Sequence, residues 1–249
     1  MTLPASAPAL QVSAVSKSFG GQRVLDAIDL QVAPGEILVL LGRSGTGKSV
    51  LLKLLVGLQH ADSGSIRIHG QEICGIAAGP LNAIRKRIGF LFQSAALYDA
   101  MTIEENVAFP LRRHTALSDA SRREQVRQLL AIVGMEKELG KMPNQISGGM
   151  QKRVGLARAL ALSPDILLFD EPTTGLDPIT ARDIGDLIRK LQRQRKIAGL
   201  VVTHDVPVAR MIADRLLLMR DGRIVCTGTF AELQRSSDPF VADFLQPIP

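Results

Sequence analysis

The chain has 249 residues, of which 46% are hydrophobic and 22% charged, so it can fold and bury a substantial core. The net charge of +6 suits binding to nucleic acid, to an anionic membrane surface or to a phosphate ligand. The alternative is a generally basic surface, because the lysines and arginines are spread along the chain. We expect no membrane span, because no apolar stretch approaches the required length of about 18 residues, and no secretion signal, because residues 1–8 lack a basic region.

The chain begins with a predicted flexible tail at residues 1–8. Residues 10–32 contain short alternating stretches that are typical of antiparallel strands. Phe19 precedes a Gly-Gly turn, where its ring could stack on a flat base or could equally be a core side chain. Cys74 and Cys226 lie far apart without metal spacing and are predicted to be reduced structural thiols of a cytoplasmic protein.

A glycine-rich loop follows the apolar run at 37–41 and precedes a helical pattern at 50–55, and its spacing G-x4-G-K-S is that of a P-loop. Glycines allow successive N–H groups to surround a phosphate, and the helix that starts there adds its positive end. The sequence therefore predicts a nucleoside-triphosphate site, with a full charge from Lys48 and a hydroxyl from Ser49 for Mg²⁺. The loop consists of Gly42, Arg43, Ser44, Gly45, Thr46, Gly47, Lys48 and Ser49.

The next segment is predicted to contain a strand at 65–69, a basic helix at 81–87 and a buried strand at 88–92 that ends at Gln93. The amide of Gln93 could reach a metal ion or the attacking water, or could be an ordinary surface group. A mainly helical section follows, beginning with a capping box at Thr102.

Ser147-Gly148-Gly149 is predicted to begin another helix, with Ser147 as its cap. The two glycines leave the backbone bare, so an anion could approach the free N–H groups closely. The alternative is an ordinary capped helix start, which would not need two glycines at this point.

Two buried strands end in polar residues that could carry chemistry. Residues 166–169 form an apolar run that ends in Asp170 and Glu171. Asp170 can organise Mg²⁺ and Glu171 can accept a proton from water or orient it, whereas the alternative is an exposed acidic loop. Residues 200–203 end at His204, at the edge where open α/β sheets place ligands, although a lone histidine is usually structural.

Taken in order, these motifs resemble those of ATP-binding-cassette (ABC) ATPases across nearly the whole chain. They are a Walker A loop at 42–49, a Q-loop Gln93, a signature Ser147-Gly148-Gly149-Met150-Gln151, a Walker B end Asp170-Glu171, a D-loop Gly175-Leu176-Asp177 and a switch His204. The resemblance implies an α/β fold: a P-loop NTPase with a RecA-like core, an antiparallel β subdomain and an α-helical subdomain. We expect one domain at 9–245, with the core and β subdomain at 9–93 and 164–245 and the helical subdomain at 94–163.

The resemblance also implies roles for individual residues, with ATP and Mg²⁺ as ligands. Phe19 takes the adenine-stacking position, and Val50, which follows the phosphate loop, is expected to contact the nucleotide. Catalysis is expected from Glu171, His204 and Gln93, and metal binding from Ser49, Gln93 and Asp170. The remaining nucleotide contacts are expected from residues 42–49 and from Ser147, Gly148, Gly149 and Asp177.

Residues 89–103, 148–162 and 170–179 resemble the ATPases of Mla-type (MlaF-like) phospholipid transporters, which maintain the lipid asymmetry of the outer membrane. This implies an ATP-sandwich homodimer bound to an MlaE-like integral membrane permease on the cytoplasmic face of the inner membrane. Accessory subunits with MCE (mammalian-cell-entry) and STAS domains are further expected partners. Some relatives continue beyond the position of 246–249 into a longer tail.

Three other functions are alternatives for this sequence. The chain could serve another MCE-type transporter or one for hydrophobic compounds. A non-transport ABC ATPase acting on DNA or the ribosome is disfavoured, because 49–166 has no heptads and there is one cassette, so no nucleic-acid partner is expected. A small-molecule P-loop kinase would not explain Ser147-Gly148-Gly149 or His204.

Overall fold

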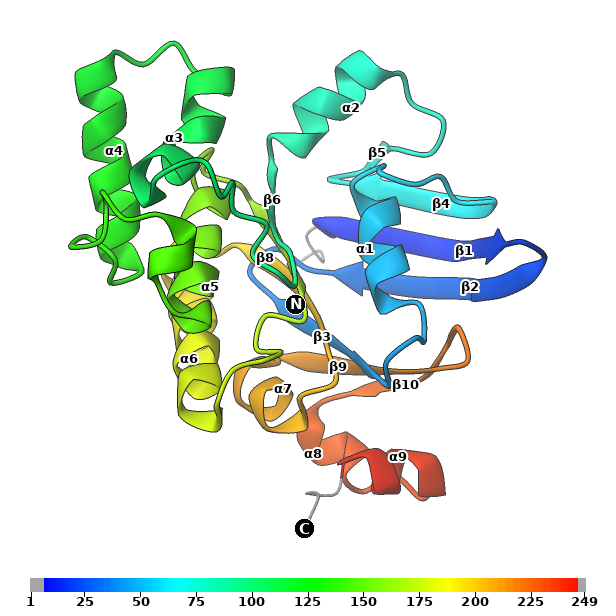
Figure 1. Ribbon diagram of the computed structural model, residues 1–249. Helices are drawn as coiled ribbons and strands as arrows, with labels where there is room; N and C mark the ends of the chain where they lie inside the picture. The colour runs from blue at the N-terminus through cyan, green and yellow to red at the C-terminus, as the bar shows by residue number, and fades with distance from the viewer. Residues whose placement is uncertain (1–6, 246–249) are drawn as a thin grey trace, which may run out of the picture.

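The computed structural model describes residues 7–245, and Figure 1 shows how they are arranged. The ends of the chain at 1–6 and 246–249, which include most of the predicted tail, lie outside the described residues. Two β-sheets and several layers of helices make up an α/β fold, as predicted. Both cysteines are free thiols.

The central sheet has six strands in the order β10-β9-β3-β8-β7-β6, and four of its neighbouring pairs are parallel. β3, β7 and β8 are apolar runs that are buried along their whole length, as expected for strands covered on both faces. Only the hairpin of β9 and β10 at one edge is antiparallel. The strands are β3 Ile37–Gly42, β6 Ile88–Leu91, β7 Ile166–Asp170, β8 Ala198–Thr203, β9 Arg215–Arg220 and β10 Arg223–Gly228.

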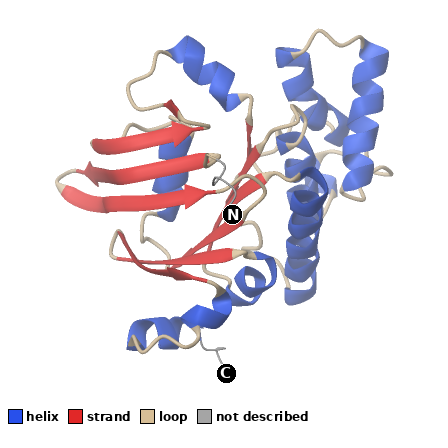
Figure 2. Ribbon diagram, turned by 180° about the vertical axis from the view of Figure 1, so that it is seen from behind, coloured by secondary structure: helices blue, strands red, loops and turns tan. Residues whose placement is uncertain are grey.

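A second, antiparallel sheet covers one face of the central sheet, with helix α1 (Lys48–Leu55) packed between the two. Figure 2, seen from behind, shows these strands on one side of the molecule and the helical section on the other. Because side chains alternate along a strand, Leu38 and Leu40 of β3 point into this core. The antiparallel strands are β1 Leu10–Phe19, β2 Gln22–Val32, β4 Ser63–Ile68 and β5 Gln71–Glu72.

The opposite face of the central sheet, to which Val39 and Leu41 of β3 point, is covered by helices. The predicted capping box of the first helix in this section is present: the Thr102 hydroxyl accepts from the backbone N–H of Glu105. The helices of this layer are α3 Ile103–His114, α4 Asp119–Ile132, α5 Gly148–Ala159, α6 Pro178–Arg195 and α7 Val206–Ile212, with a 3₁₀ turn η1 at Pro143–Gln145. Outside it lie α2 Ala78–Arg85, α8 Phe230–Leu233 and α9 Pro239–Leu245.

Three predicted elements differ from the structure in their bounds or in their burial. The helix expected at 81–87 is α2, which begins earlier at Ala78. The strand expected at 65–69 is β4, which ends at Ile68 because His69 has a left-handed backbone (φ 48°) that starts the turn to β5. The strand expected to be buried at 88–92 is β6, the edge strand of the central sheet.

The edge position of β6 explains its exposure. Phe90 and Phe92 are only partly buried, and their rings stack with centroids 4.1 Å apart. The strand ends at Leu91, so Gln93 lies in a turn two residues beyond it. Among residues 7–245, no helix is both long and apolar enough to cross a membrane.

Candidate nucleotide site

The phosphate loop joins the end of β3 to the start of α1 through two glycines in left-handed conformations, Gly45 (φ 82°) and Gly47 (φ 101°). A side chain at Gly47 would collide with β2, because its Cβ would come within 2.8 Å of the Val24 carbonyl oxygen. No side chain caps α1, and its first turn holds no acidic residue. The N–H groups at this helix start therefore suit an anionic ligand.

Lys48 is buried at the base of this loop. Its Nζ donates hydrogen bonds to the carbonyl oxygens of Gly42 and Arg43, at 2.8 and 2.9 Å. It also lies 3.4 Å from Oε1 of Glu171. Burial lowers the pKa of Lys48, and the nearby Glu171 carboxylate opposes that shift. The ammonium is thus held between the loop backbone and the carboxylate.

The structure brings together Ser49 and Asp170, which the sequence predicts as metal ligands. The Ser49 hydroxyl donates to Oδ1 of Asp170 at 2.8 Å, although β8 separates the strands that lead to them. Burial raises the pKa of Asp170; the Ser49 hydrogen bond opposes this, and the negative charge of Glu171 adds to it. A hydroxyl and a carboxylate are hard oxygen donors of the kind that Mg²⁺ prefers, so this pair fits the ion.

Glu171 and His204, which the sequence places at the ends of two buried strands, also lie in contact. Nδ1 of His204 lies 2.8 Å from Oε2 of Glu171. The same oxygen accepts hydrogen bonds from the hydroxyls of Thr174 and Thr203, at 3.1 and 3.2 Å. Glu171 has a left-handed backbone (φ 47°), which is rare for a residue with a side chain and is found at functional sites. The carboxylate is therefore held by several groups at the edge of the sheet.

Three residues of this network, Thr174, Thr203 and Lys152, were missed by sequence reasoning. Thr203 is the last residue of β8, and a polar side chain at the end of a buried strand could have indicated its role. Lys152 lies on α5 and is only 5% exposed. Its ammonium donates to the carbonyl oxygens of Gln93 and Glu171. Burial lowers its pKa, while the charges of Asp170 and Glu171 raise it.

Gln93 and Phe19 both have exposed side chains. The contact of Gln93 with the site runs through its backbone carbonyl and not through the side-chain amide that the sequence suggests. The Phe19 ring is 44% exposed, with the Lys17 ammonium 5.2 Å from its centroid. The alternative of a core phenylalanine is therefore wrong, and the hairpin of β1 and β2 carries an accessible Phe19 ring beside its turn.

The start of α5 has the predicted cap, because the Ser147 hydroxyl accepts from the N–H of Met150 at 3.3 Å. Ser147 and Gly148 are exposed, which leaves this helix end open to a partner. The presence of glycine at position 149 is explained by packing, because a Cβ there would lie 2.4 Å from Cγ2 of Thr180 on α6. The second glycine is therefore needed for helix packing.

Asp177 caps α6. Its carboxylate accepts from the N–H groups of Ile179 and Thr180, both at 3.0 Å, and from the Thr180 hydroxyl. Hydrogen bonds from Thr180 lower the pKa of Asp177. The capping role accounts for these contacts, and a contact of Asp177 with nucleotide stays a prediction.

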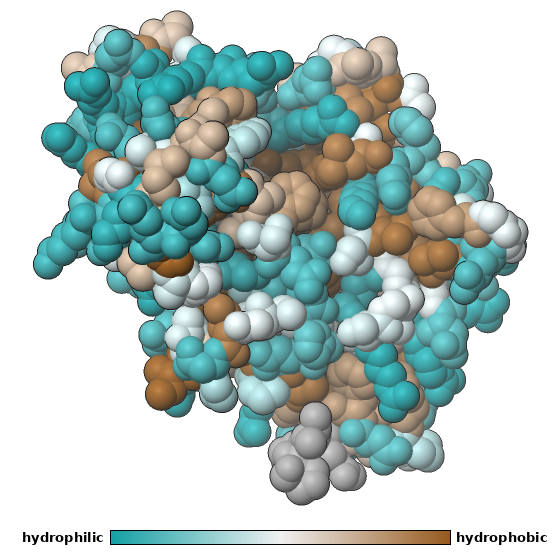
Figure 3. Space-filling model, viewed as in Figure 1, coloured by the Kyte–Doolittle hydropathy of each residue, from teal (hydrophilic) through white to brown (hydrophobic). Residues whose placement is uncertain are grey.

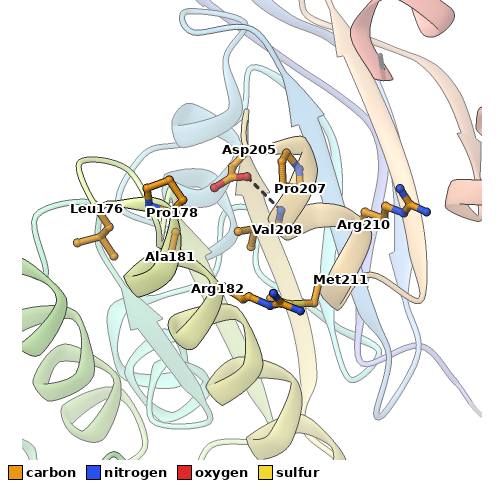
Figure 4. A pocket seen from close by; sticks show the side chains of 9 residues that line it. All are labelled: Leu176, Pro178, Ala181, Arg182, Asp205, Pro207, Val208, Arg210 and Met211. Atoms are coloured by element: carbon orange, nitrogen blue, oxygen red, sulfur yellow. Dashed lines mark hydrogen bonds between the residues drawn. The ribbon is translucent and has the colours of Figure 1, made fainter. Parts of the chain in front are cut away.

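A cavity of about 610 Å³ opens between α6 and α7 (Figure 4). It has mainly apolar walls, and Asp205 at its edge caps α7 by accepting from Val208 N–H at 3.0 Å. The phosphate loop does not line it. The lining residues are Leu176, Pro178, Ala181, Arg182, Asp205, Pro207, Val208, Arg210 and Met211.

Comparison with known proteins relates the chain to a family and to solved structures. Residues 25–174 match the family model described as ABC transporter. A solved dimeric ATP-binding cassette, MJ0796 bound to ADP and Pi, superimposes with a TM-score of 0.81 at 33% identity, covering 88% of this chain and 98% of that one.

Curated relatives carry several different names. An intermembrane phospholipid transport ATP-binding protein, MlaF of Haemophilus influenzae, is 40% identical and is covered over 90% of its length by 95% of this chain. A probable ribonucleotide transport ATP-binding protein, mkl of Mycobacterium leprae, is 43% identical, but the chain spans only 68% of it. The methionine import protein MetN of Rhizobium etli is 45% identical over 59% of its length.

Proposed function

Since the chain belongs to the ABC transporter family and is an ATP-hydrolysing subunit of such a transporter, we propose that the transporter moves phospholipid between the membranes of the cell envelope. The observation that carries this proposal is the fraction of each relative's length that the chain covers. The likeness to MlaF extends over 90% of that protein, whereas the chain spans 59% of the MetN relative and 68% of the mkl relative. Maintenance of outer-membrane lipid asymmetry is the corresponding role.

We propose that ATP binds with its phosphates on the loop at 42–49 and its base against Phe19. Lys48 and the free N–H groups of α1 would contact the phosphates. Ser49 and Asp170 would hold Mg²⁺, which neutralises charge on the β- and γ-phosphates, and Gln93 stays a candidate for a further ligand. Among residues 7–245 no cluster of three His, Cys, Asp or Glu side chains forms an all-protein metal site, which agrees with an ion held largely by water and phosphate.

Glu171 is proposed to orient the attacking water and accept its proton at the carboxylate. His204, hydrogen-bonded to the same carboxylate, is proposed to contact the γ-phosphate and to keep Glu171 in place. The surrounding hydroxyls of Thr174 and Thr203 fix the position of Oε2, so the side chain needs little rearrangement to act.

A second copy of the chain is proposed to complete the site. The exposed start of α5 at Ser147 and Gly148 presents a bare helix end, which would face the γ-phosphate bound to the partner. The solved relative MJ0796 is described as dimeric. The helix end contributes only about half a charge, so the nucleotide itself supplies much of the attraction that closes the dimer.

The surface for a membrane permease is proposed to be the groove between β6 and the helical section. A cavity of about 450 Å³ there has aromatic walls and a basic rim at Lys86 and Arg158. Figure 3 shows apolar side chains gathered in a hollow between these parts of the molecule. The loop at 93–99 borders the groove, so movement of the permease would reach Gln93 directly. An apolar permease segment with acidic side chains fits this groove.

The permease is proposed to resemble MlaE, with MCE- and STAS-domain proteins as accessory subunits. Through this contact the chain would lie on the cytoplasmic face of the inner membrane. Because cargo is handled by the other subunits, cargo identity must be measured on the whole transporter.

The deciding experiment is purification of the native complex through a tag on this chain, followed by identification of its subunits and bound lipids. The complex is then placed in phospholipid vesicles and tested for ATP-dependent movement of labelled phospholipid, methionine and ribonucleotide. ATP-dependent phospholipid movement, lost when Glu171 is replaced by Gln, supports the proposal. Movement of methionine or ribonucleotide in place of phospholipid contradicts it.

A further inference from the structure

One buried lysine connects three separate parts of the nucleotide site. Lys152 lies on α5, the helix that starts at the signature sequence. Its ammonium donates a hydrogen bond to the carbonyl oxygen of Gln93 in the loop after β6. It donates another to the carbonyl oxygen of Glu171 in the turn after β7, at 3.2 Å. The side chain is 5% exposed, so water does not replace these bonds.

The same helix holds the rest of that loop. Arg158, six residues further along α5, donates to the carbonyl oxygens of Ala95 and Ala96, each at 2.7 Å. Both alanines have left-handed backbones, with φ of 59° and 48°, which persist only where surrounding contacts enforce them. The loop is therefore shaped by cations of α5, and Lys152 supplies the contact nearest to the site.

The backbone of Glu171 is held in a comparable way. Its N–H donates to the Val202 carbonyl at 2.9 Å, and its own carbonyl accepts from Lys152. Because Glu171 has a left-handed backbone, the orientation of these two peptide groups decides where its carboxylate points. Removal of the ammonium would leave the carbonyl oxygens of Gln93 and Glu171 without this donor and would free both segments to shift.

The cost of burying Lys152 also calls for an explanation. Neighbouring buried positions on α5, such as Val154 and Leu156, are apolar, and an apolar side chain would avoid the desolvation of an ammonium. The charge does not contact the loop at 42–49 in the structure; its hydrogen bonds go to the two backbone carbonyls. These two hydrogen bonds favour a positional role for the ammonium.

We propose that Lys152 is a positioning residue for ATP hydrolysis, which joins the carbonyls of Gln93 and Glu171 so that the loop at 93–99 and the Glu171 carboxylate move as one unit. The inference rests on the role of Glu171 proposed above. It makes Lys152 the link through which a displacement of the loop by a partner changes the position of the carboxylate.

The test replaces Lys152 by Met, which keeps the length of the side chain and removes its donors, in the full-length chain. We expect the dissociation constant for Mg·ATP and the KM to stay within about twofold of the wild type, and kcat to fall by about tenfold or more. Lys152→Arg, which keeps a cation with several donors, should recover part of the lost kcat. Lys190→Met on the exposed side of α6 is the matched control and should leave turnover unchanged.

Hydrogen exchange gives a second readout that does not depend on turnover. In Lys152→Met we expect faster exchange in peptides covering 93–99 and 171–174 together, with little change along α3 and α4. A kcat within about twofold of the wild type overturns the proposal. So does a loss of ATP affinity equal to the loss of kcat, or a rise in exchange throughout the helical section, since either would show that Lys152 only maintains the fold.

If Lys152→Met does not fold, Lys152→Leu, which also removes the donors, is compared with the wild type by the same criteria. A parallel Glu171→Gln variant separates the two proposals. Normal turnover in Glu171→Gln would remove the proposed role of Glu171 itself. Slow turnover in Glu171→Gln combined with normal turnover in Lys152→Met would overturn only the inference about Lys152.

Discussion

His204 Nδ1 lies 2.8 Å from Oε2 of Glu171, and the two residues directly follow the neighbouring parallel strands β8 and β7. Glu171 is the first residue after β7, and His204 is the first after β8. The carboxyl ends of parallel strands meet at one edge of a sheet, so residues 33 positions apart in the chain are brought into contact. The pair forms the part of the site where water would be activated.

Replacement of Glu171 by Gln should separate ATP binding from hydrolysis. The amide keeps the size of the side chain but is a poor proton acceptor, so kcat should fall by about 100-fold or more while ATP binding persists. Phosphate release measures the first quantity and light scattering with ATP measures whether a dimer accumulates. Turnover close to that of the wild type would contradict the assignment.

Replacement of Lys48 by Ala should weaken nucleotide binding. A charge-assisted contact with phosphate is worth about 1.5–3 kcal/mol, so the dissociation constant should rise by roughly 10- to 100-fold. Equilibrium binding of a fluorescent ATP analogue provides the measurement. Lys53→Ala on the exposed side of the same helix is the control, and an equal loss of affinity in both variants would argue against a specific role for Lys48.

Replacement of Phe19 by Ala should also reduce nucleotide affinity, by roughly tenfold, because base stacking contributes about 1–3 kcal/mol. Phe19→Tyr keeps the ring and should bind as the wild type does. The ring is exposed, so neither variant should change the free energy of unfolding much. Equal affinities of Phe19→Ala and the wild type would exclude stacking at this position.

Gly149→Ala should destabilise the fold by about 1–3 kcal/mol, because the new Cβ would overlap Cγ2 of Thr180. Gly148→Ala is the comparison, since its Cβ would meet only Leu176 at an ordinary 3.7 Å. Adding Thr180→Ser removes the methyl group and keeps the hydroxyl that donates to Asp177, so the double variant should regain stability. Urea unfolding measures all three, and a double variant no more stable than Gly149→Ala would refute the clash.

Glu72 should make stability depend on pH. Burial opposes its ionisation, but hydrogen bonds from the Ser65 hydroxyl and from the N–H groups of Cys74 and Ile66 prevail and lower its pKa from 4.5 to about 2. A lowered folded-state pKa stabilises the fold above pH 4.5, and this contribution is lost as the pH falls from 4.5 towards about 2.

The corresponding variant is Glu72→Gln. After discounting for partial exposure, it should lower the free energy of unfolding by about 1–2 kcal/mol at neutral pH, and by progressively less below pH 4.5. Exposed Glu136→Gln is the control. A stability difference that does not change with pH would contradict the role of the Glu72 charge.

The sequence predicted those parts of the site that depend on local pattern. The phosphate loop, the strand ends at Asp170 and His204 and the cap at Ser147 each follow from residues adjacent in the chain. The meeting of Ser49 with Asp170 could also be anticipated, because parallel strands deliver their ends to one edge.

The remaining contacts depend on packing between distant segments, which pattern alone does not contain. Lys152 meets the Gln93 carbonyl 59 positions earlier in the chain, and nothing near either residue signals the contact. Gly149 is required by Thr180 on another helix. An apolar run also does not indicate whether its strand lies at the edge of a sheet, which is why the exposure of Phe90 was missed.

The strands β6 and β7 are hydrogen-bonded neighbours, yet α3, α4 and α5 all lie between them in the chain. The segment that carries α3, α4 and α5 is thus a single long insertion in one β-crossover of the central sheet. Within this segment α5 carries Lys152, whereas α3 and α4 can diverge in sequence without altering the strands that carry Asp170 and Thr203. Changes confined to α3 and α4 would therefore reshape the groove beside β6 while leaving the proposed hydrolytic residues in place.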